Sequence, residues 1–172
     1  MKKETKNLTV FATIMASLLM GNLAIAYTTD WCYSGSGYNC DQCDGINAAY
    51  SLACAGSYCS GIRQDCDNQG FFMMNMYWTN YVSEEAPNSV TCDSGYIVGG
   101  MDCNGPYCDE VALHCVNIGL GPGFDCNWVG PVSEESPSRI SCPGTGYISG
   151  VRCEGGYCDN MSIYCCDYDY LD

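Results

Sequence analysis

Short apolar segments bounded by glycine, asparagine and proline recur along the chain, and their pattern predicts β-strands. Residues 111–116 and 161–165 alternate between apolar and polar positions, as expected of strands with one buried face. Residues 96–98 and 147–149 are shorter β-rich segments bounded by glycine, and residues 71–78 predict a longer strand. No segment shows a sustained helical period with helix caps. The pattern therefore predicts an all-β fold.

The first 26 residues have the three parts of a secretory signal peptide. Lys2, Lys3 and Lys6 form a positive region, residues 8–20 are mainly apolar, and Ala24-Ile25-Ala26 provides small residues for cleavage. The apolar run is shorter than the roughly 20 residues that span a bilayer. We therefore expect cleavage rather than the alternative, a retained anchor helix, and a protein that is secreted, periplasmic or at the cell surface.

The sixteen cysteines all follow residue 26 and repeat one pattern three times. Four cysteines in each copy have the spacing C-x10-C-x4-C-x6-C, and the copies begin 49 and 50 residues apart. The repeats cover about residues 31–66, 78–116 and 126–166. Because about 50 residues cannot bury an adequate core alone, we expect one disulfide-rich domain over residues 27–172, with three sheet repeats in pseudo-threefold symmetry.

An even cysteine count in an exported chain predicts disulfides. The C-x4-C pair of each repeat closes a glycine-containing turn, and the outer pair joins its first strand region to its last. The predicted bonds are Cys43–Cys66, Cys54–Cys59, Cys92–Cys115, Cys103–Cys108, Cys142–Cys165, Cys153–Cys158, Cys32–Cys40 and Cys126–Cys166. Two alternatives remain: a redox or zinc site at Cys40-Asp41-Gln42-Cys43, and a strained vicinal bond between Cys165 and Cys166.

The charge of the chain excludes several functions. Lys+Arg is 6 against Asp+Glu 20, and removal of the first 26 residues leaves 146 residues, three arginines, no lysine and a net charge of −16. Nucleic-acid binding and attraction to anionic membrane surfaces both need a cationic face. With one histidine and no lysine in the exported part, we expect no enzymatic activity, no metal and no cofactor.

Repeats two and three share a pattern that resembles the vitelline-membrane outer-layer protein family. The matching residues are Trp128, Cys142-Pro143-Gly144, Gly146-Tyr147-Ile148, Asp159-Asn160 and Ile163-Tyr164-Cys165-Cys166. The resemblance implies a β-prism of three Greek-key sheets, similar in architecture to jacalin-type lectins, and an extracellular coat protein that interacts with carbohydrate. The family's longer Gly-Asp-Asp-Thr-Ala-Leu-Asn loop is replaced here by a short Cys-x-Gly-x-Tyr-Cys turn.

These turns carry the predicted ligand-binding residues: Tyr107, Asp109, Glu110, Tyr157, Asp159 and Asn160. An aromatic ring beside carboxylate or amide oxygens suits a sugar, which stacks on the ring and donates hydroxyl protons. The alternative is structural, with the aspartate capping the turn and the tyrosine packing on the disulfide. Repeat one keeps Tyr58 without the acid, so we expect at most two equivalent sites.

Other candidate residues have structural alternatives. Glu84, Glu85, Glu134 and Glu135 are candidate calcium ligands together with Asp109 and Asp159, or belong to solvated acidic loops. We expect His114 to be a strand residue, and Trp31, Trp78 and Trp128 to lie in the core, one in each repeat. The sequence thus predicts a secreted lectin-like module that binds a glycan. The alternative is an extracellular structural or protein-interaction protein, such as a coat, adhesin or effector with an envelope partner.

Overall fold

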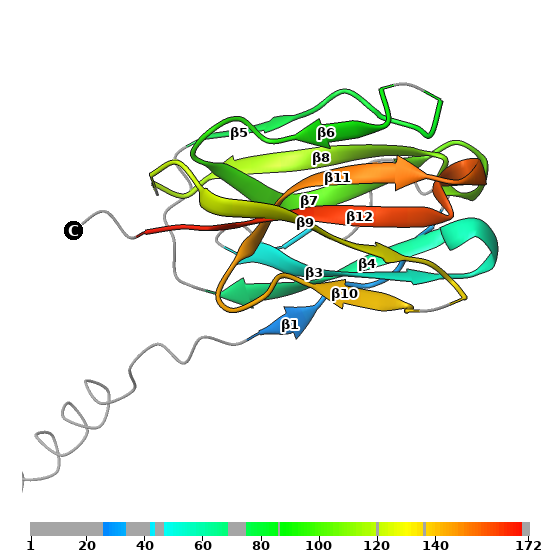
Figure 1. Ribbon diagram of the computed structural model, residues 1–172, viewed down its shortest axis with the longest axis horizontal. Coiled ribbons are helices and arrows are strands. Elements are labelled where there is room, and N and C mark those ends of the chain that lie inside the picture. The colour runs from blue at the N-terminus through cyan, green and yellow to red at the C-terminus, as the bar shows by residue number, and fades with distance from the viewer. Residues whose placement is uncertain are drawn as a thin grey trace, which may run out of the picture.

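The computed structural model describes residues 26–33, 42–43, 47–68, 75–85, 87–119, 121–135 and 137–169. Within these ranges the regular elements are strands, apart from three one-turn 3-10 segments. The strands form three antiparallel sheets around one shared interior (Figure 1). The predicted all-β class is therefore confirmed. The predicted signal peptide lies almost entirely outside the described residues, which begin at Ala26.

Each sheet is built on one long hairpin. The hairpins are β3 (Asn47–Ala55) with β4 (Gly61–Asn68), β7 (Tyr96–Asn104) with β8 (Glu110–Asn117), and β11 (Tyr147–Glu154) with β12 (Asn160–Asp167). These strands contain the four segments predicted at residues 96–98, 111–116, 147–149 and 161–165. The predicted longer strand at 71–78 is seen as β5 (Asn75–Trp78), and its residues 71–74 lie outside the described residues.

All three hairpins have a register shift at the corresponding position. The shift places one extra residue in the first strand of each hairpin: Tyr50, Gly99 and Ser149. A bulged residue leaves backbone groups without a partner in its own ladder. Its carbonyl oxygen accepts a hydrogen bond from a cysteine of another repeat in every case. The bonds are Cys43 N to Gly99 O at 2.9 Å, Cys92 N to Ser149 O at 2.8 Å, and Cys142 N to Tyr50 O at 2.8 Å.

Short strands extend this exchange between repeats. The strand β6 (Ser89–Thr91) of repeat two pairs with β11 of repeat three, and β10 (Arg139–Ser141) of repeat three pairs with β3 of repeat one. The outer edges are formed by β5 against β8 and by β9 (Phe124–Val132) against β12. Two short strands, β1 (Tyr27–Thr28) and β2 (Cys32–Tyr33), pair with β4. Each repeat thus contributes backbone to the sheet of the next in cyclic order.

Seven disulfides join described residues, and they are seven of the eight predicted pairs. The bonds are Cys43–Cys66, Cys54–Cys59, Cys92–Cys115, Cys103–Cys108, Cys126–Cys166, Cys142–Cys165 and Cys153–Cys158. They overturn the vicinal alternative and a metal or thiol role for Cys43. Cys32 is also disulfide-bonded, while its predicted partner Cys40 lies outside the described residues.

Three of these bonds link neighbouring sheets. Cys92 follows the strand that completes the third sheet, but its partner Cys115 lies in β8 of the second. Cys142 with Cys165, and Cys43 with Cys66, make the same connection between the other two pairs of sheets. The three outer disulfides therefore form a ring of cross-links around the interior.

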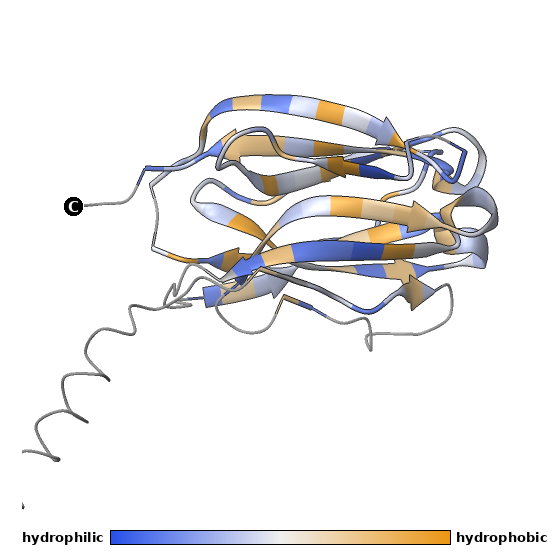
Figure 2. Ribbon diagram, turned by 90° about the horizontal axis from the view of Figure 1, so that it is seen from below, coloured by the Kyte–Doolittle hydropathy of each residue, from blue (hydrophilic) through white to orange (hydrophobic). Residues whose placement is uncertain are grey.

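Apolar side chains from all three hairpins fill the interior, in agreement with the alternating hydropathy along the strands (Figure 2). The largest fully buried ones include Leu52, Ile62, Leu113, Ile148, Met161 and Ile163. His114 lies in β8, as predicted, and is buried. Burial lowers its pKa below the usual value, so the imidazole is neutral at physiological pH.

The prediction that the three tryptophans lie in the core is wrong. Trp128 is 37% exposed, and Trp31 and Trp78 are half-buried. Each indole covers a polar side chain: Arg63 lies 4.4 Å from the ring of Trp31, His114 stacks on Trp78 at 4.9 Å, and Arg152 lies 4.3 Å from the ring of Trp128. At Trp31 and Trp128 the face of the indole attracts the guanidinium cation while the edge of the ring remains in water.

Candidate functional site

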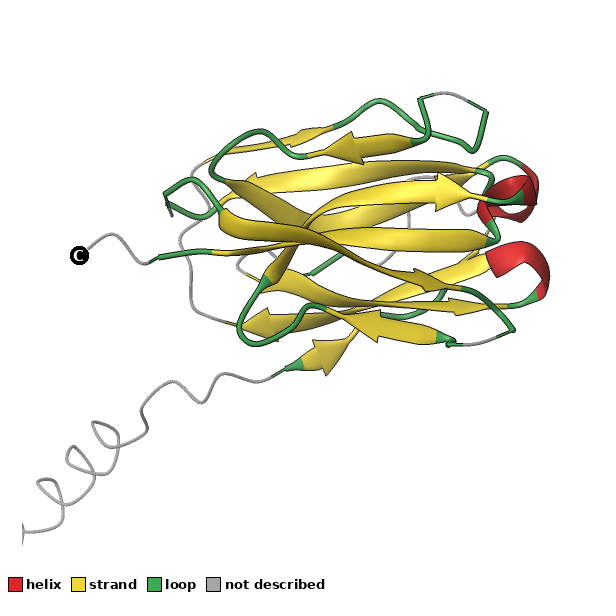
Figure 3. Ribbon diagram, in the orientation of Figure 1, coloured by secondary structure: helices red, strands yellow, loops and turns green. Residues whose placement is uncertain are grey.

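The three hairpins end in the same turn, which has an unusual backbone. In each turn a glycine precedes a three-residue 3-10 segment: η1 (Ser57–Cys59), η2 (Pro106–Cys108) or η3 (Gly156–Cys158). The tyrosine and the cysteine that end each segment have φ between 52° and 60°. L-residues adopt this left-handed region at a cost of about 1–3 kcal/mol each, and such residues cluster at functional sites. Figure 3 shows the turns in red at one end of the molecule.

Local chemistry holds these turns in place. The preceding glycines, Gly56, Gly105 and Gly155, have φ near 70° and ψ near 180°, a combination available only to glycine. A Cβ atom at Gly105 or Gly155 would collide with the carboxylate of the aspartate four residues later. A disulfide joins the end of the hairpin's first strand to the last residue of the turn, as in Cys103–Cys108.

The turns bring one tyrosine from each repeat into a single cluster, here called the tyrosine apex. The ring centroids of Tyr58, Tyr107 and Tyr157 are 5.3, 5.5 and 5.4 Å apart, and the ring planes meet at 62–63°. These are edge-to-face contacts between touching rings. The three side chains remain 42–44% exposed. The apex is thus an exposed aromatic surface of three almost equivalent rings.

Backbone contacts between the turns stabilise the apex in the same cyclic order. Each turn cysteine lies beside a carbonyl oxygen of another repeat: Cys59 Sγ to Asp159 O at 3.2 Å, Cys108 Sγ to Ser60 O at 3.2 Å, and Cys158 Sγ to Asp109 O at 3.1 Å. A disulfide sulfur has no proton to donate, so these are S···O contacts rather than hydrogen bonds. They fix the three turns against one another.

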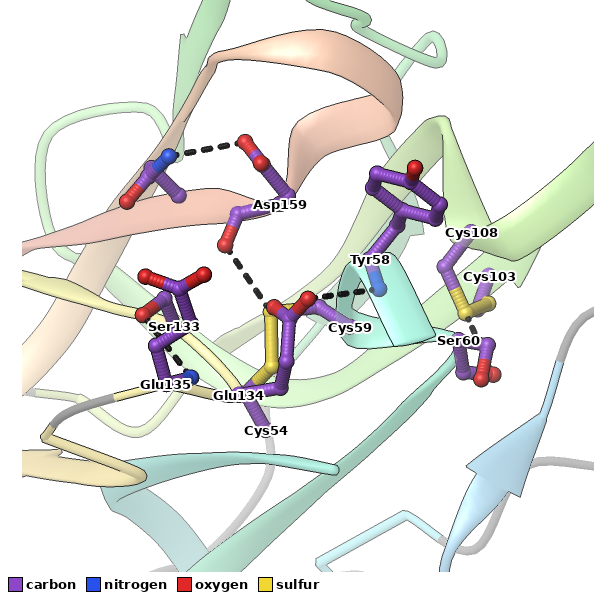
Figure 4. The surroundings of a disulfide bond; sticks show 11 residues. Cys54, Tyr58, Cys59, Ser60, Cys103, Cys108, Ser133, Glu134, Glu135 and Asp159 are labelled. Atoms are coloured by element: carbon purple, nitrogen blue, oxygen red, sulfur yellow. Dashed lines mark hydrogen bonds between the residues drawn. A yellow bond between two sulfur atoms is a disulfide. The ribbon is translucent and has the colours of Figure 1, made fainter. Parts of the chain in front are cut away.

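Two glutamates from the Ser-Glu-Glu loops accept backbone protons of the turns, and Figure 4 shows one of them, Glu134, beside Tyr58. Tyr58 N donates to Glu134 Oε1 at 3.0 Å, and Tyr157 N donates to Glu84 Oε1 at 3.1 Å. The serine of each loop supports the arrangement, since Ser133 Oγ accepts from Glu135 N at 3.2 Å and Ser83 Oγ does so from Glu85 N. Each loop therefore places a carboxylate at the turn of the next repeat.

At the turn of repeat two, which carries Tyr107, no described residue provides such a carboxylate. The paired position two residues before each glutamate is occupied by Val82 in repeat two, Val132 in repeat three and Cys32 in repeat one. Ser34, two residues after Cys32, therefore corresponds in sequence to the two glutamates. A serine has no carboxylate, and no described residue accepts a hydrogen bond from Tyr107 N. The apex accordingly has two capped N–H groups and, within the described part of the chain, one without an acceptor.

The predicted binding residues divide into two groups. Tyr107 and Tyr157 lie in the apex. Asp109 and Asp159 instead fill the space beside Gly105 and Gly155, where they support the turns. Asn160 donates to Asp159 Oδ1 at 2.7 Å, and Glu110 accepts from Asn104 Nδ2 at 2.8 Å. The structure therefore brings the two predicted tyrosines together in one cluster and places the polar residues that follow them beside the turns.

Sequence reasoning missed two features of this cluster. Tyr58 is its third member, although repeat one lacks the acid that was used to recognise a site. Glu84 and Glu134 are caps for other repeats rather than parts of purely solvated loops, while Glu85 and Glu135 are exposed. The repeated Tyr-Cys and Ser-Glu-Glu motifs were the available signals, but no local pattern shows that they meet.

The polar groups at the apex carry negative charge. Burial, and then the neighbouring charges of Glu110 and Glu84, raise the pKa of Asp109 above the usual 3.8.

One group of three possible metal-ligating residues is found in the described ranges: Cys54, Cys59 and Glu134. The two cysteines are bonded to each other, so they offer no thiolate to a metal.

The three arginines of the described chain are all engaged elsewhere. Arg63 and Arg152 lie over tryptophan rings, and Arg139 forms an ion pair with Asp65. Asp65, the buried partner of this pair, also accepts a hydrogen bond from Thr28 Oγ1 at 2.7 Å. The acids at the apex thus have no arginine partner among the described residues.

No family model, curated protein or solved structure matches this chain significantly. A search of the described residues for a helix of membrane-spanning length and apolarity finds none. The density of disulfides is typical of proteins from oxidising compartments.

Proposed function

We propose that this protein is an exported, lectin-like module that binds a glycan at the tyrosine apex. The observation that carries the proposal is the convergence of Tyr58, Tyr107 and Tyr157 into one exposed surface. Tyrosine presents a broad apolar face and a polar hydroxyl, a combination that suits the mixed surface of a sugar ring. The proposed activity is binding without catalysis.

Hydrogen-bonding groups around the rings support a glycan ligand. Sugar hydroxyls both donate and accept hydrogen bonds. The apex provides acceptors in the carboxylate oxygens of Glu84 and Glu134 and a donor in the backbone N–H of Tyr107. The disulfide-clamped turns hold these groups before a ligand arrives. Such preorganisation lowers the entropic cost of binding.

The proposed architecture is a β-prism with its pseudo-threefold axis near the tyrosine apex, as in the vitelline-membrane outer-layer proteins that the sequence resembles. The cyclic exchange of strands and the equal ring separations support this proposal. Proposed export is supported by the start of β1 at Tyr27, directly after the predicted cleavage point.

Glycan-array binding tests the proposal with wild-type protein and the triple variant Tyr58→Asn/Tyr107→Asn/Tyr157→Asn. Asparagine tolerates the left-handed backbone, so the turns are retained while the rings are removed. We expect the variant to bind at least about tenfold more weakly than wild type, because aromatic anchors dominate binding sites of this kind. Thermal unfolding verifies that it folds.

Phe124→Ser is the matched control, since Phe124 is an exposed aromatic in β9, at the opposite end of β12 from the turns. The control retains full binding if the apex is the site. Wild-type protein that binds no glycan, or a triple variant that binds as well as wild type, would refute the proposal. Turnover of a bound glycan would contradict the absence of catalysis.

The second candidate function is that of a structural or protein-interaction protein, and the acidic surface favours it. A net charge of −16 after signal cleavage, without lysine, attracts basic partners over long range. Its test is binding of purified basic proteins at low and high salt. Strong, salt-sensitive binding that persists in the triple tyrosine variant would favour this function over glycan recognition.

A further inference from the structure

We infer that the tyrosine apex selects a cationic glycan, one whose sugars carry a free ammonium group, over neutral and anionic glycans. This inference rests on the proposed glycan-binding function and adds the charge class of the ligand. It follows from three features of the apex: the rings, the two carboxylates beside them and the absence of a cation that neutralises those carboxylates within the described chain.

The carboxylates lie at the backbone of two tyrosines of the apex. Glu134 Oε1 is 3.0 Å from the backbone nitrogen of Tyr58, and Glu84 Oε1 is 3.1 Å from that of Tyr157. Each carboxylate accepts one hydrogen bond from a backbone N–H and can accept further hydrogen bonds from a ligand. An ammonium group gains here from the carboxylates and from the faces of tyrosine rings together.

The charges around the apex also favour a cationic ligand over an anionic one. The described arginines Arg63, Arg139 and Arg152 are engaged with Trp31, Asp65 and Trp128. Glycans with uronate or sulfate groups therefore meet carboxylates without a compensating cation, and like charges repel them. An amino sugar meets the opposite field, and its hydroxyl oxygens still find the donor at Tyr107 N.

Three hexasaccharides with the same linkage test the inference, since they differ only in the group at sugar carbon 2. β-1,4-linked glucosamine, N-acetylglucosamine and glucose carry an ammonium, an acetamide and a hydroxyl there. Calorimetric titration at mildly acidic pH keeps the amine protonated and most carboxylates ionised. We expect the glucosamine hexamer to bind about tenfold or more tightly than the other two at low salt. Added salt should reduce this preference.

The double variant Glu84→Gln/Glu134→Gln isolates the two charges. Glutamine keeps an oxygen that accepts from the backbone N–H groups, so the turns stay capped. We expect this variant to bind the glucosamine hexamer about five- to tenfold more weakly and to lose less affinity for the neutral hexamers, because the amide oxygens still accept from sugar hydroxyls. Asp125→Asn/Asp169→Asn is the control of equal charge, because both residues are exposed near the far ends of β9 and β12.

The outcomes separate this inference from the function on which it rests. Equal affinity for the three hexamers, or tighter binding of the neutral ones, overturns the charge preference and leaves glycan binding intact. Failure to bind these hexamers and every glycan on the array overturns both. An equal loss in the two double variants, or binding that survives the triple tyrosine variant, indicates nonspecific attraction of charge and also overturns the inference.

Discussion

At the scale of single residues, the tyrosines of the apex show how an unfavourable backbone is maintained. Tyr58, Tyr107 and Tyr157 have φ of 54–60°, which a tyrosine does not prefer by itself. A glycine on one side and a disulfide-bonded cysteine on the other leave the short turn little conformational choice. The strained conformation aims three rings toward one point.

Two adjacent glycines provide the first prediction. Gly155 has φ of +75° and lies against Asp159, whereas no atom lies within 4 Å of a Cβ placed on Gly156. We expect Gly155→Ala to lower the free energy of unfolding by about 1–3 kcal/mol. Gly156→Ala should raise it by about 0.4–1 kcal/mol, because alanine restricts the unfolded chain. Thermal unfolding of the oxidised protein compares them, and equal effects would contradict the assigned turn geometry.

The second prediction concerns the pH dependence contributed by Asp109. Its pKa is raised above 3.8, first by burial and then by the charges of Glu110 and Glu84. The folded state therefore holds this proton more tightly than the unfolded state, and stability falls as the pH rises from about 3.8 through the folded pKa. Glu110→Gln removes one of these charges while keeping an acceptor for Asn104.

We therefore expect Glu110→Gln to lower the pKa of Asp109 and to raise stability at neutral pH but not below pH 3.8. Carboxyl titration by NMR measures the pKa, and unfolding at both pH values measures the stability. In repeat three the corresponding pair is Asp159 and Asn160, where the amide donates to the carboxylate instead. An unchanged Asp109 pKa in the variant would argue against this electrostatic account.

At the scale of the elements, each hairpin is completed by a neighbour. The bulge exposes a carbonyl that accepts from a cysteine of another repeat, and a short strand such as β6 or β10 extends the sheet beside it. The Ser-Glu-Glu loop before that strand reaches the turn of the same neighbour. One connection thus supplies a strand, a disulfide cysteine and a cap.

The third prediction separates the two glutamates of one loop. Glu134 caps the turn at Tyr58, whereas the side chain of Glu135 is exposed. We expect Glu134→Ala to lower the free energy of unfolding by about 1–2 kcal/mol, because a backbone donor loses its charged acceptor. Glu135→Ala should change it by less than about 0.5 kcal/mol. Denaturant unfolding measures both, and a larger effect at Glu135 would refute the capping role.

At the scale of the whole molecule, disulfides of two kinds support the fold. The outer bonds, such as Cys92–Cys115, join different sheets, while Cys126–Cys166 joins the paired strands β9 and β12 within one sheet. In repeat two, Met76 and Val116 pair at the position that corresponds to Cys126 and Cys166. An apolar pair therefore already occupies this position in one sheet.

The fourth prediction follows from that difference. Cys92→Ala/Cys115→Ala should destabilise the protein by about 2–5 kcal/mol, the usual effect of removing a native disulfide. Cys126→Met/Cys166→Val should cost less, although its loop is longer, because strand pairing persists and the new side chains refill the space. Thermal unfolding of the two double variants tests this order. A larger loss in the Met/Val variant would show that the chain-entropy effect dominates.

Much of the architecture follows from local information in the sequence. The strands at residues 111–116 and 161–165 follow from two-residue periodicity, and those at residues 96–98 and 147–149 follow from β-rich composition between glycines. Both signals depend on neighbours along the chain. The tip disulfides join cysteines five residues apart, and the outer ones join cysteines 23 residues apart in each repeat. Because the cysteine spacing is identical in three copies, one pairing pattern chosen for a single repeat applies to all three.

The apex depends on tertiary structure because its parts come from distant repeats. Glu134 and Tyr58 are 76 residues apart and meet only after strands have been exchanged in cyclic order. Residue type alone did not reveal that the carboxylate of Asp109 lies against Gly105. Its side chain occupies the space that the missing Cβ of the glycine leaves open. The indoles of Trp31 and Trp128 likewise stay outside because arginines lie under their rings. Local periodicity specifies strands and turns, whereas packing between repeats determines which side chains share a surface.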